Sequence, residues 1–278
     1  MQPWTFAALF ALIVWSVQRA VSKAVLATLS TPQFYLLSAL ISLPFYVPIL
    51  IADLPPVSAL PGALGVSALM ALTFGITTEA IRRGPVGRVS PLTGLSPALT
   101  AMLALTILGE RISPAQGAGV VLAMAAIVLL GYRRTREPGP SGWLALALAS
   151  FGLQGFGAFL AKIVVTPSGP SALLVTSAAV QVAVGAVLLR RSGAPFPDLR
   201  PRLMRWAALV LALAAIATIG YLWALSKGPA TVVVPLVATS PALGGLLGAV
   251  VLKERTTRAQ YAGILLGLAG AVFLVMPG

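Results

Sequence analysis

Cysteine and histidine are both absent from this chain of 278 residues. Their absence excludes disulfide bonds, a cysteine nucleophile, an imidazole base and the usual zinc ligands. Acidic residues are scarce as well, with six Asp and Glu against 19 Lys and Arg. A membrane-embedded enzyme would need catalytic groups that converge on one place. We therefore expect no enzyme activity, no catalytic residue, no metal and no cofactor.

Charge of either sign is rare, because only 9% of the residues are charged and 58% are hydrophobic. A soluble domain carries about 25% charged residues, so this chain lacks the polar surface that a globular protein in water requires. The net charge of +13 does not indicate nucleic-acid binding. Its Lys and Arg lie in short groups between apolar runs, which is typical of the loops of a membrane protein.

Ten apolar runs are long enough to cross the roughly 30 Å hydrocarbon core as helices. We expect an all-α membrane protein with transmembrane helices near 4–28, 33–52, 62–82, 85–108, 114–132, 142–163, 170–190, 203–226, 229–252 and 257–276. Residues 1–17 lack the basic start of a signal peptide, so we expect none. Capping boxes are predicted at Ser113–Gln116 and Thr257–Gln260.

Lys and Arg concentrate in alternate connections, the first, third, fifth, seventh and ninth. Cytoplasmic loops carry an excess of these residues. The bias therefore predicts that the odd connections face the cytoplasm and that both termini lie on the opposite, periplasmic side.

An internal repeat supplies the strongest pattern in the chain. Residues 84–130 align without a gap with residues 228–274, and nearly half of the aligned positions are identical. The shared phrases are S-P-A-L, E-R and A-Q. A fainter match pairs Trp4 with Trp143 and Lys23 with Lys162. Each half thus has five helices, and because five is odd the second half enters the membrane inverted, as in many secondary transporters. A duplication kept only for packing is the alternative.

Prolines near the bilayer centre mark both halves of the repeat. Pro97 and Pro241 lie about 18 Å from the start of their spans at 1.5 Å per residue, and Pro91 and Pro235 precede them. Proline removes a helical hydrogen bond, and bare carbonyls must face protein or a wet cavity. We expect these four prolines to act as hinges in kinked helices that line a substrate pathway. A plain kink satisfied by Ser96 or Ser240 is the alternative.

Polar and aromatic residues at similar depth extend this predicted site. The candidate substrate-binding residues are Trp15, Gln18, Arg19, Thr73, Thr77, Glu79, Ser90, Thr93, Ser96, Gln154, Tyr221, Trp223, Thr239 and Ser240. Thr218 is a further candidate. Each could instead form an interhelical hydrogen bond. Glu79 could serve cation or proton coupling or pair locally with Arg82 and Arg83.

Other residues are expected to have structural roles in helix packing, membrane anchoring or ion pairing. Gly119…Ala123 and Gly263…Gly267 have the small-residue spacing that lets helices pack closely, in the bundle or in a dimer. Trp4, Trp143 and Trp206 are expected at the membrane interfaces. Glu110 and Glu254 are expected to pair with the adjacent Arg111 and Arg255.

With these motifs in place, the whole chain resembles the drug/metabolite transporter superfamily. Within it the chain is similar to EamA-type exporters, and most to the YddG-type exporters of aromatic amino acids. The resemblance implies two five-helix repeats, at 1–137 and 138–278, around a central cavity. It also implies export of amino acids, including aromatic ones, or of related metabolites. The first helix lacks the acidic residue that small multidrug members use.

We therefore expect a secondary transporter that works by alternating access in a bacterial inner membrane. Its partners would be a small-molecule substrate and the lipid bilayer, with no nucleic acid, and it would be a monomer or a weak homodimer. A passive metabolite channel, or an exporter of other drug-like or metabolite substrates, is the alternative.

Overall fold

The computed structural model describes residues 2–26, 30–131, 142–193, 201–250 and 256–276. Every regular element among them is a helix. The helices of the first half are α1 (Pro3–Leu26), α2 (Thr31–Ala52), the 3₁₀ turn Val57–Ala59, α3 (Leu60–Arg83), α4 (Val86–Gly94), α5 (Ser96–Ile107) and α6 (Pro114–Gly131). Those of the second half are α7 (Trp143–Ser168), α8 (Ser171–Ser192), α9 (Pro201–Lys227), α10 (Ala230–Ala238), α11 (Ser240–Val250) and α12 (Arg258–Val275).

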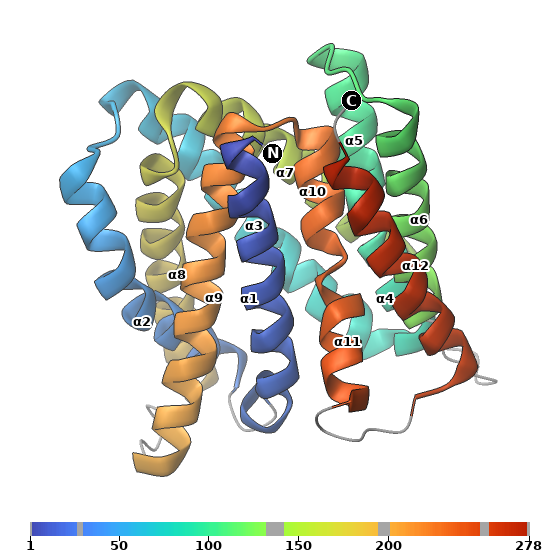
Figure 1. Ribbon diagram of the computed structural model, residues 1–278. Coiled ribbons are helices and arrows are strands. Elements are labelled where there is room, and N and C mark those ends of the chain that lie inside the picture. Colours follow the sequence, from blue (N-terminus) through green and yellow to red (C-terminus); the bar gives the residue numbers. More distant parts are fainter. Residues whose placement is uncertain (1, 27–29, 132–141, 194–200, 251–255, 277–278) are drawn as a thin grey trace.

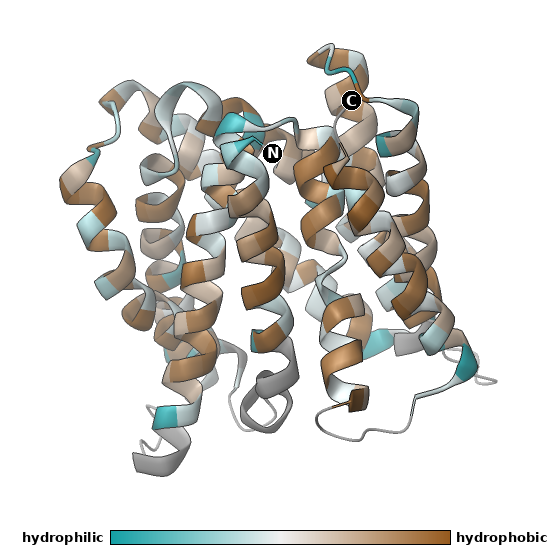
Figure 2. Cartoon of the chain, in the orientation of Figure 1, coloured by the Kyte–Doolittle hydropathy of each residue, from teal (hydrophilic) through white to brown (hydrophobic). Residues whose placement is uncertain are grey.

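The helices form one upright bundle with both chain ends on the same face, the upper one in Figure 1. Within the described residues nine segments are long and apolar enough to cross a membrane. The described apolar part of α1, Pro3–Gln18, is shorter than these nine segments. Hydrophobic residues cover most of the length of the outward helices (Figure 2). The chain is therefore a multi-pass membrane protein, as its composition predicts.

The predicted fourth and ninth spans are interrupted beside Pro97 and Pro241, as expected, and the interruption is a full break of the helix. Each is two helices, α4 and α5, and α10 and α11, separated at Leu95 and Thr239. The Leu95 N–H donates to the carbonyls of Leu92 and Thr93, and Thr239 repeats this pattern with Leu236 and Val237. The carbonyls that Pro97 and Pro241 would free are thus bonded within a tight turn.

Several boundaries match the predicted ones, while one differs. Thr257 and Gln260 exchange the two hydrogen bonds of a capping box, and so do Ser113 and Gln116. Helix α7 continues to Ser168, beyond the predicted end at residue 163, because Pro167 is tolerated in its last turn. It stops at Gly169, whose φ of +69° is in the left-handed region.

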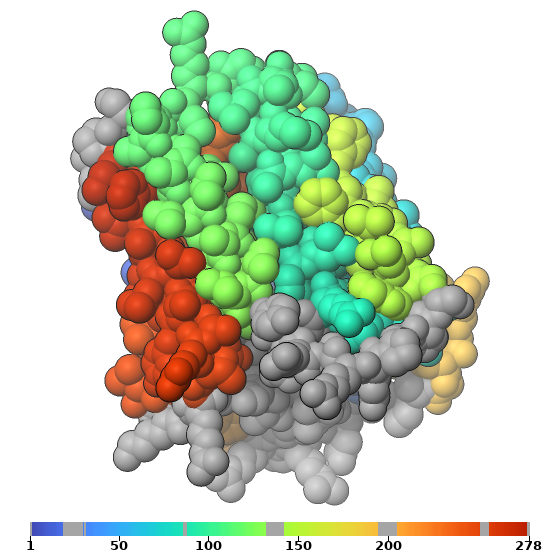
Figure 3. Space-filling view, turned by 90° about the vertical axis from the view of Figure 1, so that its right-hand side faces the viewer, coloured from blue at the N-terminus to red at the C-terminus, as the bar shows by residue number. Residues whose placement is uncertain are grey.

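The two halves pack on one another in reciprocal pairs. Helix α1 packs on α9 and its repeat mate α7 packs on α3, while α2 packs on its own mate α8. Helices α6 and α12 lie side by side along one edge (Figure 3). The inverted five-plus-five repeat therefore forms a single interlocked bundle.

Small residues permit the α6–α12 contact. A Cβ on Gly119 would lie 2.9 Å from the backbone nitrogen of Leu274, and one on Gly263 would lie 3.1 Å from that of Leu130. The predicted packing role of these glycines is confirmed within the chain.

One tryptophan at a span end packs inside the bundle. Trp4 is buried, and its indole packs on Gly228 of the other half, where a Cβ would overlap the ring. Its mate Trp143 is partly buried, and only its Cβ lies near Gly84, 3.0 Å from where a Cβ on that glycine would lie. The absence of a side chain at Gly228 leaves room for the indole inside the bundle, while the expected interface depth of Trp4 stays a prediction.

Candidate functional site

A cavity of about 440 Å³ lies midway along the bundle. Helices α1, α2 and α3 line it together with their repeat mates α7, α8 and α9. The cavity thus lies where the two halves meet. This volume falls within the range of small-molecule sites.

Aromatic side chains form much of the cavity wall. The rings of Trp15 and Tyr221 are 5.5 Å apart with a 48° tilt. Phe74 stacks on Phe34 at 6.1 Å and meets the edge of Tyr35 at 5.2 Å. Aromatic pairs prefer tilted or offset arrangements of this kind. The wall offers flat, apolar surfaces from both halves.

Polar groups interrupt this aromatic wall. The polar lining residues are Gln18, Ser38, Ser42, Ser67, Ser177, Gln181 and Thr218, with the hydroxyls of Tyr35, Tyr46 and Tyr221. Ser67 is already bonded to Thr176 at 2.9 Å. Gln18 and Gln181 have no hydrogen-bond partner among the described residues. The described lining contains amides and hydroxyls but no Asp, Glu, Lys or Arg.

Of the predicted site residues, Trp15, Gln18 and Tyr221 line this cavity, and Thr218 does so too. Trp223 lines a different cavity at the upper end of α9. Arg19 is on α1 outside the side chains that the structure describes. The sequence did not single out the aromatic residues of α2, because Phe and Tyr within an apolar run are equally typical of a lipid-facing surface.

The remaining predicted residues lie outside the described lining of the central cavity. Thr73, Thr93 and Thr239 donate to carbonyls of their own helices, Leu69, Val89 and Leu236 respectively. Thr77 also bonds Ser150 of α7. Ser90 is half-buried on α4. Such bonds inside a helix or between helices are the alternative already noted for these residues.

The two helix breaks are bonded to the opposite half. The Ser96 hydroxyl at the start of α5 donates to the Gln154 carboxamide of α7 at 2.9 Å. The Ser16 hydroxyl of α1 donates to the Ser240 carbonyl at the start of α11 at 3.0 Å. Each broken span is therefore held by the first helix of the other repeat, with Pro91, Pro97, Pro235 and Pro241 beside the breaks.

Glu79 forms the local ion pair. Its carboxylate accepts from Arg82 at 2.9 Å and from Arg83 at 2.6 Å, at the lower end of α3. The pair lies outside the described lining of the central cavity.

Glu110 does not have the partner that its position in the sequence indicates. Its carboxylate accepts the backbone N–H groups of Ala230 and Thr231 and the Thr231 hydroxyl, all at 2.9 Å. These N–H groups begin α10 and lack partners within it, and a carboxylate there also meets the positive end of the helix dipole. Glu110 thus caps a helix of the other half. The pairing expected for Glu254 lies outside the described residues.

Lys162 completes the contact on this face. Its ammonium donates to the carbonyls of Leu225 at 2.9 Å and of Gly228 at 2.8 Å, where α9 ends. A cation at a helix C-terminus satisfies carbonyls that have no helical donor. Together Glu110 and Lys162 stabilise the α9–α10 turn at the upper face.

The two faces of the molecule are not equally closed. Near the upper face α10 packs against α5 and α6, and every residue from Ala230 to Val237 is buried. In the repeat, α4 corresponds to α10, α11 to α5 and α12 to α6. Among the described residues, neither the α4–α11 pair nor the α4–α12 pair makes a comparable contact. The described helices of the two symmetric halves therefore pack asymmetrically, with the closer packing near the upper face.

No group of three or more acidic, histidine or cysteine residues that could hold a metal exists in the described part of the chain. The site consists of aromatic rings, hydroxyls and amides. Such groups bind an organic molecule by contact and hydrogen bonding.

Comparisons with known proteins agree with this architecture. A solved structure, described only as the crystal structure of a protein, has a TM-score of 0.77 to this chain at 18% identity. The match covers 98% of this chain and 96% of the other, and it shows the shared fold. An uncharacterized protein of Methanocaldococcus jannaschii is 30% identical over 131 residues, which are 47% of this chain and 93% of that protein. That relative corresponds to about one half of the bundle.

The profile of the EamA-like transporter family matches the chain twice, at residues 2–132 and 141–276. The two matches cover both halves of the inverted bundle, and the cavity lies between them. The chain belongs to the EamA-like transporter family, whose members are membrane transporters of small molecules rather than enzymes.

Proposed function

We propose that the protein is a secondary transporter that exports amino acids, including aromatic ones, or related small metabolites by alternating access. The observation that carries the proposal is a mid-bundle cavity lined by both halves in a molecule closed at one face. A cavity that serves transport must be closed to one side while it exchanges solute with the other.

The cavity wall favours a particular chemistry. Trp15 and Tyr221 suit a flat apolar group, and the amides of Gln18 and Gln181 can bond polar groups. Since the described wall has no ionised side chain, a solute with a large net charge would lose its hydration without an opposite charge to replace it. Neutral or zwitterionic solutes such as aromatic amino acids fit this wall.

Alternating access follows from the symmetry. Exchange of the roles of the two halves would separate α10 from α5 and bring α4 against α11, which would close the lower face. Pro91, Pro97, Pro235 and Pro241 flank the breaks and would act as hinges, while Ser96, Gln154 and Ser240 would hold the broken spans in each state. The excess of Lys and Arg in the odd connections supports an orientation with the lower face in the cytoplasm and both termini in the periplasm of a bacterial inner membrane.

Counterflow distinguishes a transporter from a passive channel. Proteoliposomes loaded with unlabelled L-phenylalanine, L-threonine or L-methionine should accumulate the same labelled amino acid transiently, and uptake should saturate. A passive channel would show neither result. Failure of all three amino acids would remove the amino-acid proposal.

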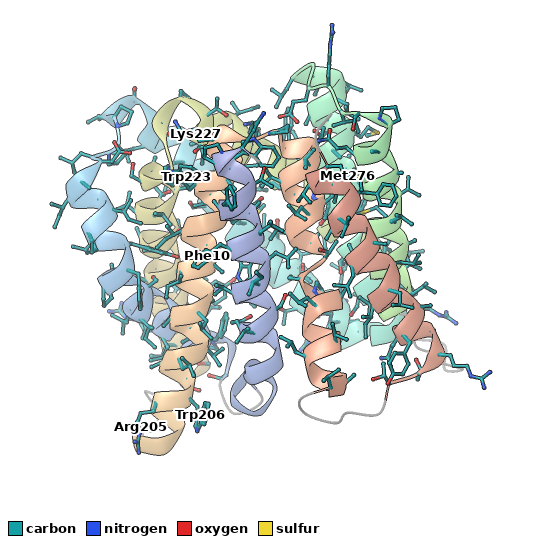
Figure 4. All side chains as sticks on the ribbon, viewed as in Figure 1. Phe10, Arg205, Trp206, Trp223, Lys227 and Met276 are labelled. Atoms are coloured by element: carbon teal, nitrogen blue, oxygen red, sulfur yellow. The ribbon has the colours of Figure 1, made fainter. Side chains whose placement is uncertain are left out.

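The Trp15→Ala variant tests the cavity itself. Loss of the ring removes the Trp15–Tyr221 contact, and aromatic pairs of this kind contribute about 0.5–1.5 kcal/mol beyond the area they bury. We expect the counterflow rate for L-phenylalanine to fall about two- to tenfold. The matched control is Trp206→Ala, because Trp206 is exposed at the lower end of α9 (Figure 4). Equal rates for both variants would remove Trp15 from the site.

A further inference from the structure

A second cavity, of about 470 Å³, lies at the upper face. It is bounded by the last turns of α2 and α9 and by the turn between α7 and α8. It is separate from the central cavity but adjacent to it along two helices. On α2 Tyr46 lines one and Pro48 lines the other, and on α9 Tyr221 lines one and Trp223 the other.

Two opposite charges share this second cavity. Asp53 follows the end of α2 and Lys227 ends α9, and they are the ionisable residues of its described lining. Neither forms an ion pair with another residue that the structure describes. A carboxylate and an ammonium that border one cavity without pairing are both available to a ligand.

The backbone brings Asp53 to the α7–α8 turn. The Asp53 N–H donates to the Ile49 carbonyl at 2.8 Å, which ends α2. A Cβ on Gly169 would lie 3.1 Å from Asp53 Oδ2, and the φ of +69° at Gly169 is one that other residues rarely adopt. Glycine at this turn therefore leaves room for the Asp53 side chain against the α7–α8 turn.

Trp223 supplies an apolar surface beside the charges. Trp223 and Lys227 are four residues apart on α9, hence on one helix face, near its upper end (Figure 4). Tryptophan and lysine at a helix end are typical of membrane-interface anchors. An anchoring role does not explain why Asp53 lines the same cavity.

We propose that this cavity is a binding site for a small zwitterion. The cationic amine of the ligand lies at Asp53, its carboxylate or phosphate at Lys227, and its apolar part against Trp223. If the ligand is a transported amino acid, this cavity is a second binding site on the pathway beside the central cavity. That reading rests on the proposed function. The same chemistry is present in the headgroup of phosphatidylethanolamine, so the experiment must separate the two sources.

Fluorine NMR of protein labelled with 5-fluorotryptophan reports both cavities at once. The chain has five tryptophans, and Trp15→Phe and Trp223→Phe assign the two signals needed. In detergent, L-phenylalanine should shift the Trp223 signal in a saturable way. A shift at Trp15 without one at Trp223 removes the free amino acid as the ligand of this site and leaves the proposed function standing. A shift at Trp223 alone keeps the site and removes the central cavity from the proposed function.

Charge variants test the recognition. Asp53→Asn should weaken the L-phenylalanine effect at Trp223 about tenfold and leave the effect of 3-phenylpropionate, which has no amine, unchanged. Lys227→Gln should weaken the L-phenylalanine effect similarly and leave that of L-phenylalaninamide, which has no carboxylate, unchanged. Arg190→Gln, at an exposed cation on the lower end of α8, is the control. Unchanged L-phenylalanine affinity in both cavity variants overturns the proposal. In each variant, a Trp15 signal at the wild-type position without ligand shows that the protein is folded.

Nanodiscs separate the two sources of the zwitterion. If L-phenylalanine shifts the Trp223 signal equally in phosphatidylglycerol discs with and without phosphatidylethanolamine, the ligand is the free amino acid. If phosphatidylethanolamine alone shifts the signal, and Asp53→Asn abolishes that shift, the ligand is the lipid headgroup. Absence of any shift with both probes overturns the site.

Discussion

At the scale of single residues, Glu110 links the two halves most directly. Its carboxylate accepts three hydrogen bonds from the start of α10, while Lys162 bonds the end of α9. Hydrogen bonds to charged groups contribute about 1.5–3 kcal/mol each when buried. The closed upper face therefore depends on a carboxylate from the first repeat.

Glu110→Gln should loosen that face. The amide keeps one acceptor oxygen but places N–H donors against the α10 donors, so we expect a loss of about 1.4 kcal/mol and a tenfold rise in the opened fraction. Because the chain has no cysteine, a single Ala224→Cys, at a fully buried site near the α9–α10 turn, reports opening through its rate of maleimide labelling. Glu79→Gln should leave that rate unchanged. An equal rate in Glu110→Gln would show that Glu110 does not hold the face closed.

The role of a residue was predictable from the sequence where its partner is close in the chain, and was not predictable where the partner lies in the other repeat. Ser113 and Thr257 cap their helices as their spacing to Gln116 and Gln260 indicates. The partner of Glu110 lies in the other repeat and has no local signal. The sequence identifies Trp15 because a tryptophan so far from a helix end is unusual, whereas Tyr46 resembles its apolar neighbours.

At the scale of elements, α6 and α12 form the closest packed pair. Their glycines let backbones touch, so that a Cβ on Gly270 would lie 2.9 Å from the nitrogen of Ala123. The sequence predicts such motifs, because the spacing of small residues along a single helix is enough to identify them.

The positions of the breaks in the fourth and ninth spans were predictable from Pro97 and Pro241. Their form was not, because the bonds at Leu95 and Thr239 depend on the local turn.

Gly270→Ala should therefore destabilise the protein, by about 1–3 kcal/mol, since backbone atoms cannot move aside for the added methyl. Gly65→Ala is the matched control, because nothing lies within 4 Å of its would-be Cβ. That variant should be as stable as wild type or up to about 1 kcal/mol more stable. Thermal unfolding in detergent measures both. Equal melting temperatures for the two variants would mean that α6 and α12 can separate freely.

At the scale of the whole molecule, the sequence repeat predicts two equivalent halves, and the bundle shows them packed unequally. Helix α10 contacts α5, while its mate α4 has no comparable described contact with α11. A repeat specifies what the halves share, but the state in which they pack depends on small energy differences between two arrangements. The central claim is that these two contacts alternate.

Distances between spin labels test this claim most directly. Phe6 with Thr106 reports the upper face, and their repeat mates Ala145 with Val250 report the lower face; all four residues are exposed. Without substrate we predict a short upper and a long lower distance. Saturating transported amino acid should add a population with the two reversed. Distances that never change, or that lengthen and shorten together, would contradict alternating access.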